Sequence, residues 1–152
     1  MKKAQRHRAR EAALQILYQC EIGRYAVEEA VETFFGLQWP GADPAPEDLR
    51  AFASDLARET LRRLPSIDPL IADTAERWRP ERMAVLDRLI MRMAVCELLR
   101  DPKTPAAVVI NEALELARTF STEEAVKFIN GMLDGIRKKI DGEPDVGHLQ
   151  SK

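Results

Sequence analysis

Apolar residues recur along this 152-residue sequence at the steps of three and four that amphipathic α-helices require. No segment alternates with period two over a useful length, and prolines and glycines separate one apolar stripe from the next. The pattern predicts seven helices, over residues 9–20, 27–35, 49–64, 67–78, 81–100, 104–120 and 121–142. The predicted fold class is therefore all-α.

The fifth segment, residues 81–100, is apolar on nearly every side, which predicts a helix at the centre of the fold. Its polar exceptions, Asp87, Arg88 and Arg92, then require solvent or a partner. All nine prolines are interpreted as lying in first helical turns or outside helices.

Local signals predict where the last two helices begin. Thr104 and Pro105 are typical of an N-cap followed by the first helical residue. The run STEE at 121–124 has the spacing of a capping box, in which Ser121 pairs with Glu124. In the last helix, Gly131 and Gly135 are interpreted as sites of close helix packing, and the residues after 140 as a mobile tail.

Composition and charge narrow the class of protein. With 45% apolar and 32% charged residues, the chain has the composition of one globular domain rather than of a disordered or membrane-spanning protein. Cys20 and Cys96 lie far apart in apolar stretches, and residues 9–17 are too polar for a signal peptide, so we expect a cytoplasmic protein. The net charge of −2 conceals an asymmetry, because five of the 23 basic residues and no acidic residue lie within residues 1–10. This basic arm carries +5, and the remaining 18 basic and 25 acidic residues give −7.

The sequence offers no set of catalytic or metal-ligating residues. Its two histidines are His7 in the arm and His148 in the predicted tail, and no nucleophile motif, phosphate-binding loop or Cys/His cluster occurs. We therefore expect no enzymatic reaction, no cofactor and no metal.

The basic arm has two interpretations. It can neutralise RNA phosphates, or it can be a frayed, solvated terminus, although cations at a helix N-terminus oppose the macrodipole. In a helix that begins near Arg8, one face carries Arg8, Glu11, Gln15 and Tyr18. Tyr18 can stack on a base there or cover the edge of the core.

A second candidate surface lies in the last helix, where Glu124, Lys127, Phe128 and Asn130 fall close to its N-terminus. A stripe formed by residues 125, 128 and 132 favours a core position for Phe128.

Four segments, in this order and spacing, carry a resemblance to a known family: RHRAREAALQILYQCE, DRLIMRMAVCEL, TPAAVVINEALELARTF and KFINGMLDGI. Together they resemble the NusB family of bacterial transcription antitermination factors, over roughly residues 6–138. The resemblance implies two small helical subdomains that form one compact unit, an RNA-binding domain over residues 1–140. The loop at 37–47 and the tail over 141–152 have no counterpart in the family.

The resemblance also implies a function without catalysis. NusB-like proteins bind boxA-type single-stranded RNA together with NusE, a small-subunit ribosomal protein, and act in the RNA polymerase antitermination complex that transcribes ribosomal RNA. The positions that it assigns to RNA are Arg6, Arg8, Arg10, Tyr18, Glu124, Lys127 and Phe128. It assigns Asp87, with its neighbour Arg88, to NusE.

Alternatives remain open at this point. The chain can be a protein-binding helical adaptor whose basic arm has no specific RNA target. A NusB-like domain also occurs fused to an RNA cytosine methyltransferase, for which 152 residues leave no methyl-donor domain. Glu124 can cap its helix or contact RNA, and the resemblance allows a homodimer that hides the arm.

Overall fold

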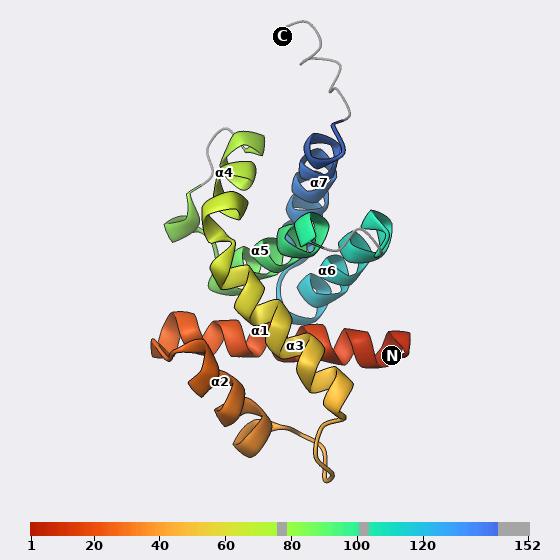
Figure 1. The fold of residues 1–152 in the computed structure, drawn as a ribbon. Helices are drawn as coiled ribbons and strands as arrows, with labels where there is room; N and C mark the ends of the chain where they lie inside the picture. The colour runs from red at the N-terminus through yellow and green to blue at the C-terminus, as the bar shows by residue number, and fades with distance from the viewer. Residues whose placement is uncertain (76–78, 101–103, 143–152) are drawn as a thin grey trace, which may run out of the picture. The chain divides into compact units, whose positions relative to one another are not determined.

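The computed structural model describes residues 1–75, 79–100 and 104–142, and within them it contains helices and no strand (Figure 1). Seven α-helices follow one another: α1 Lys3–Gly23, α2 Val27–Thr33, α3 Glu47–Arg62, α4 Leu64–Thr74, α5 Val85–Arg100, α6 Ala106–Phe120 and α7 Glu123–Ile140. A π-helix, η1 Phe34–Gln38, continues α2, and a 3₁₀ turn, η2 Pro80–Arg82, precedes α5. The predicted all-α fold is confirmed, and every predicted helix overlaps an observed one.

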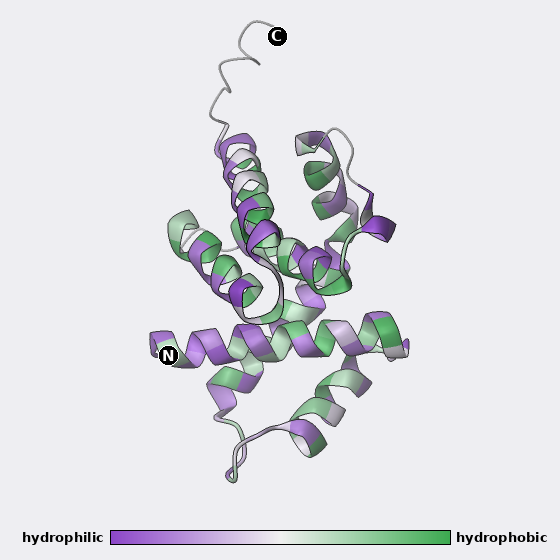
Figure 2. Ribbon diagram, turned by 180° about the vertical axis from the view of Figure 1, so that it is seen from behind, coloured by the Kyte–Doolittle hydropathy of each residue, from purple (hydrophilic) through white to green (hydrophobic). Residues whose placement is uncertain are grey.

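The chain divides into two compact helical units, Met1–Arg63 and Leu64–Lys152. In the first unit, α1 packs against α3 and α2. Small residues of both helices are buried, among them Ala9, Ala12 and Ala13 on α1 and Ala53 and Ala57 on α3. Hydrophobic and hydrophilic residues alternate along the helices in Figure 2.

In the second unit, α5 contacts α4, α6 and α7, as expected for a central helix. Its residues from Leu89 to Glu97 are buried apart from Arg92, because apolar side chains cover almost the whole circumference. Gly135 of α7 faces α4, where an added Cβ would lie 3.0 Å from Thr74 Cγ2. The close-packing interpretation therefore holds for Gly135. It is wrong for Gly131, around which an added Cβ would meet no atom within 4 Å.

Helix ends differ from the predictions in ways that have local causes. The residue in the left-handed conformation after α1 is Arg24, with φ 58°. Gly23 instead makes room for a ring, since a Cβ there would lie 2.7 Å from Tyr25 Cε2. Pro105, and not Thr104, is the N-cap of α6. The interpretation of all prolines as helix boundaries is wrong at Pro69, which lies inside α4.

The polar residues Asp87, Arg88 and Arg92 of α5 lie in different environments. Arg92, with 13% of its side chain exposed, donates two hydrogen bonds to Asp68 of α4, Nε to Oδ1 and Nη2 to Oδ2, both 2.9 Å. Arg88 is half-buried and also has a partner. Asp87 Oδ1 is buried and has no hydrogen-bond partner among the described residues.

Asp68→Ala is expected to lower the free energy of unfolding by about 1–3 kcal/mol, because it removes both bonds from a largely buried guanidinium. Urea unfolding followed by circular dichroism measures this loss. The matched control is Glu115→Ala, which removes the exposed partner of Arg118 and should cost less than about 1 kcal/mol. Equal losses in both variants would contradict the structural role of the Arg92–Asp68 pair.

The two cysteines lie within the helices, Cys20 half-buried in α1 and Cys96 buried in α5. Burial raises the pKa of the Cys20 thiol. The C-terminal segment 143–152, predicted as a mobile tail, lies outside the described residues. Gly142, with φ 73°, follows the end of α7 near the predicted helix stop.

Candidate nucleic-acid interface

The basic arm belongs to helix α1, which begins at Lys3, five residues before the predicted start near Arg8. Lys2, Lys3, Arg6 and Arg8 are exposed, and the first turn contains no acidic residue. These four cations form no ion pair with any carboxylate that the structure describes. Because their charges also oppose the helix macrodipole, they are not explained by helix stability.

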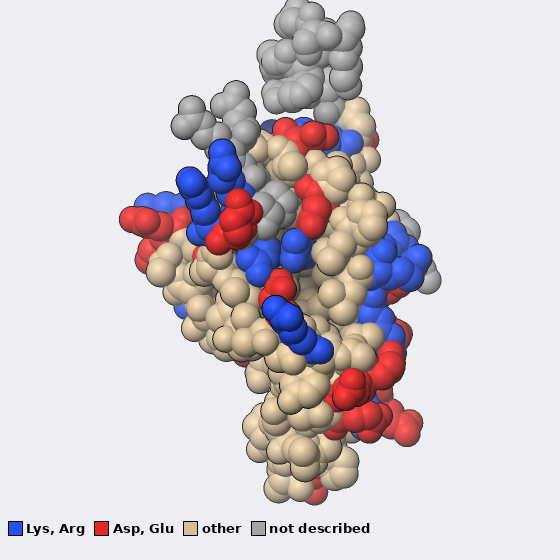
Figure 3. Space-filling model, turned by 90° about the vertical axis from the view of Figure 1, so that its left-hand side faces the viewer, with Lys and Arg blue, Asp and Glu red and all other residues tan. Residues whose placement is uncertain are grey.

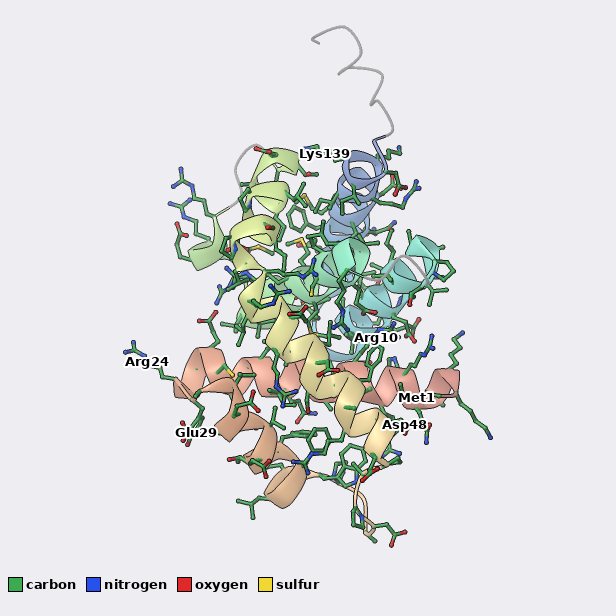
Figure 4. All side chains as sticks on the ribbon, in the orientation of Figure 1. Met1, Arg10, Arg24, Glu29, Asp48 and Lys139 are labelled. Carbon is green, nitrogen blue, oxygen red and sulfur yellow. The ribbon has the colours of Figure 1, made fainter. Side chains whose placement is uncertain are left out.

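Arg10 has a different environment from the rest of the arm. Only 2% of it is exposed, and its guanidinium carbon lies 5.3 Å from the centroid of the Phe52 ring on α3. Figure 4 labels this residue on α1. The cause is helical spacing, since Arg10 shares a face with Ala13, Leu14 and Leu17, all of which are buried. The expectation that Arg10 lies in a solvated arm is therefore wrong.

The other face of α1 is open to solvent. Arg8 and Gln15 are exposed, Tyr18 is 41% exposed, and Glu11 is half-buried, 3.8 Å from His7. Arg8 and Tyr18 thus lie on one exposed side of the helix with Glu11 and Gln15, as its periodicity predicted. The partly exposed Tyr18 ring agrees with both of its interpretations, stacking on a base and covering the edge of the core.

The basic residues of α3 are paired with carboxylates. On α3, Arg50 pairs with Glu32 at 2.9 Å, Arg58 with Glu28 at 2.6 Å, and Arg62 with Glu59 at 2.5 Å. The hydrogen bonds from Arg58 hold the pKa of the Glu28 carboxyl below its ordinary value. Figure 3 shows one face of the molecule, on which acidic and basic side chains both occur. Unpaired positive charge therefore distinguishes the N-terminal part of α1 from α3.

The start of α7 is capped by Thr122, whose hydroxyl oxygen accepts a hydrogen bond of 3.1 Å from the backbone N–H of Ala125. The predicted capping box of Ser121 with Glu124 is wrong, since the helix begins one residue later than it requires. Glu124 consequently occupies the second helical position, where its charge suits the macrodipole while its side chain stays exposed.

Phe128 lies on the outer side of α7 and is 44% exposed. The buried stripe of this helix is Val126, Ile129, Met132, Leu133 and Ile136. The sequence interpretation that favoured a core position for Phe128 is therefore wrong, because the neighbouring residue Ile129 belongs to the buried stripe and Phe128 does not. Glu124, Lys127 and Phe128 share one exposed face at steps of three and four, and Gly131 leaves open space at the next position of that face.

The residues assigned to RNA thus form two groups, one in each unit. Arg6, Arg8 and Tyr18 lie on α1 of the first unit, and Glu124, Lys127 and Phe128 on α7 of the second. Asn130 lines a groove between α6 and α7 together with Asn111 and Asp134, and Gly131 lines it too. The residues assigned to a protein partner, Asp87 and Arg88, lie in the first turn of α5.

Sequence reasoning missed one aromatic residue next to these groups. Trp39, at the start of the loop after η1, lies under the guanidinium of Arg8, whose carbon is 4.7 Å from the ring centroid. The signal in the sequence is a tryptophan in the aromatic run FFGLQWP, within the loop at 37–47 that has no counterpart in the family resemblance.

Comparison with known proteins shows the family to which the chain belongs. The sequence model of the NusB family matches residues 7–138, most of the chain. The chain belongs to the NusB family. Two relatives named transcription antitermination protein NusB are each 44% identical to it. The one from Koribacter versatilis aligns over 143 residues, 94% of this chain and 95% of that protein. The one from Solibacter usitatus aligns over 137 residues, 90% and 91% respectively.

Solved structures share the fold of this NusB-family chain. NusB from T. maritima is 33% identical, with a TM-score of 0.78 over 88% of this chain and 91% of that one. A crystal structure of the antitermination factors NusB and NusE in complex with double-stranded RNA gives a TM-score of 0.79. That likeness covers 91% of this chain and 99% of that chain at 22% identity, which shows a common fold.

Membrane-spanning helices and metal-binding clusters are both absent from the described residues of this NusB-family chain. None of its described helices has the length and apolar character needed to cross a membrane. Within the same residues, no group of three or more His, Cys, Asp or Glu side chains is arranged to hold a metal ion.

Proposed function

We propose that this chain is an RNA-binding transcription antitermination factor that binds boxA-type single-stranded RNA together with NusE and supports ribosomal RNA transcription within the RNA polymerase antitermination complex. Membership of the NusB family and the names of its relatives support the process. The observation that carries RNA binding is the exposed positive charge near the N-terminus of α1, where Arg6 and Arg8 lack carboxylate partners among the described residues. Tyr18 is exposed on the same face of α1 as Arg8.

The chemistry of the exposed side chains suggests how such an RNA is held. Arg6, Arg8 and Lys127 neutralise phosphates and release counterions. Tyr18 and Phe128 stack on unpaired bases, whose faces are accessible only where the RNA is single-stranded. Glu124, which has no capping role to fulfil, accepts a hydrogen bond from an exocyclic amino group of a base. Arg10 contributes indirectly, by fixing α1 on α3 through Phe52.

The protein partner is assigned to the first turn of α5. Asp87 and Arg88 are half-buried there, and Oδ1 of Asp87 is buried without a hydrogen-bond partner among the described residues. A basic side chain of NusE would approach the part of this carboxyl group that stays accessible. The net charge of −7 outside residues 1–10 favours association with a basic ribosomal protein.

RNA fluorescence anisotropy tests the proposal with boxA-type RNA, a scrambled strand of equal composition and a duplex, each with and without NusE, across a salt series. We expect boxA-type RNA to bind at least about tenfold more tightly than the scrambled strand when NusE is present. We also expect the logarithm of the affinity to fall linearly with the logarithm of the salt concentration. Equal binding of boxA-type and scrambled RNA in the presence of NusE would favour the alternative, a protein-binding adaptor without specific RNA recognition.

A further inference from the structure

An aromatic cluster follows α2 in the first unit, and Trp39 is its outermost member. The Trp39 ring centroid lies 5.7 Å from that of Phe35 and 6.2 Å from that of Phe34, and the two phenylalanine rings meet edge to face at 5.0 Å. Phe34 is 2% exposed, whereas Trp39 is half-buried. The indole thus packs near the buried Phe34 ring, while part of it stays accessible to solvent.

The loop after Trp39 folds close to the indole because residue 41 has no side chain. A Cβ at Gly41 would lie 2.8 Å from Trp39 Nε1 and 3.3 Å from the backbone oxygen of Asp43. Both contacts are shorter than ordinary van der Waals separation, so a side chain at Gly41 would displace the indole. The loop and the phenylalanine rings together fix the position of Trp39.

Arg8 of α1 rests on this fixed ring. Its guanidinium carbon lies 4.7 Å from the Trp39 ring centroid, within the range of a cation–π contact. Arg50 lies at a comparable 5.3 Å from Phe35, but it is also paired with Glu32 at 2.9 Å. Arg8 has no carboxylate partner among the described residues, and its side chain is exposed. The aromatic ring therefore orients the Arg8 cation without neutralising it.

We propose that Trp39 is a positioning residue of the RNA surface, and that the Arg8–Trp39 pair forms a subsite for one phosphate of the RNA backbone. A guanidinium that stacks by its face keeps the N–H donors at its edge free for phosphate oxygens. Because the Trp39 ring already restricts the Arg8 side chain in the free protein, this side chain loses less conformational entropy when RNA binds. The inference rests on the proposed RNA-binding function and extends its surface from α1 onto the loop after η1.

A double-mutant cycle on the full chain, measured by anisotropy with boxA-type RNA, tests the pair. Trp39→Ala should weaken binding about two- to fivefold, and the same substitution in an Arg8→Ala background should have almost no effect. Trp39→Phe, which keeps an aromatic face, should restore most of the affinity. Far-UV circular dichroism and thermal unfolding confirm that each variant is folded at the temperature of the measurement.

Gly41→Ala is a second variant that keeps the tryptophan but displaces it. It should lower RNA affinity in the wild-type background and not in the Arg8→Ala background. Equal losses from Trp39→Ala in both backgrounds, or no loss in either while the wild type binds, would overturn the positioning role and leave the proposed function standing. A wild-type chain that fails to distinguish boxA-type from scrambled RNA in the presence of NusE would overturn both.

Discussion

Replacing Arg6 and Arg8 together with alanine is expected to weaken the binding of boxA-type RNA about 10- to 100-fold at about 0.15 M salt. Both cations are exposed on α1 and lack carboxylate partners among the described residues, so their full charge is available to phosphates. The slope of the logarithm of affinity against the logarithm of salt concentration should fall in magnitude by about 1.4, the value for two phosphates of a single strand. Anisotropy titrations at several salt concentrations measure both quantities.

The stability of the same variant separates a binding role from a structural one. Removing Arg6 relieves a charge that opposes the helix macrodipole, whereas removing Arg8 loses its contact with Trp39, so the free energy of unfolding should change by less than about 1 kcal/mol. The matched control is the double variant Arg62→Ala with Arg118→Ala, which removes two exposed cations that are paired with Glu59 and Glu115. A comparable loss of affinity in this control would show that total charge, and not the α1 surface, determines RNA binding.

Much of the fold could be predicted because the apolar stripes are long and regular. The buried run in α5 and the stripe of α3 lie where their periodicity indicated, since burial is what creates such a pattern. Helix ends were harder to predict, because two neighbouring residues can each serve as the N-cap of the same helix. Ser121 and Thr122 are both good N-caps, and one residue of difference decides whether Glu124 reaches the capping position.

The candidate site was harder to predict because single residues can lie on either side of a stripe. Arg10 was grouped with the arm by its charge, although its spacing from Ala13 and Leu17 places it in the core. Phe128 was favoured for the core by its apolarity, although Val126 and Ile129 define the buried stripe. Trp39 could not have been connected with Arg8, because their contact joins α1 to a loop 31 residues later and has no periodicity to reveal it.

Adjacent residues of α7 should give opposite results when each is replaced with alanine. Phe128→Ala is expected to weaken RNA binding by about 1–3 kcal/mol, the range for one base stacked on an aromatic ring. Because Phe128 is 44% exposed, the free energy of unfolding should change by less than about 0.5 kcal/mol. Ile129→Ala should lower the free energy of unfolding by about 2–5 kcal/mol, because Ile129 is completely buried and its truncation leaves a cavity.

Phe128→Tyr and Phe128→Leu determine whether the ring itself is required. Tyrosine keeps an aromatic face and should retain the affinity of the wild type, whereas leucine keeps apolar area without a π-system and should bind as weakly as alanine. Urea unfolding and RNA anisotropy on the same preparations separate the two effects. If Phe128→Ala destabilises the protein as much as Ile129→Ala, or if leucine binds RNA as tightly as tyrosine, Phe128 is a packing residue. The RNA surface would then be confined to the first unit, on α1 and the loop that carries Trp39.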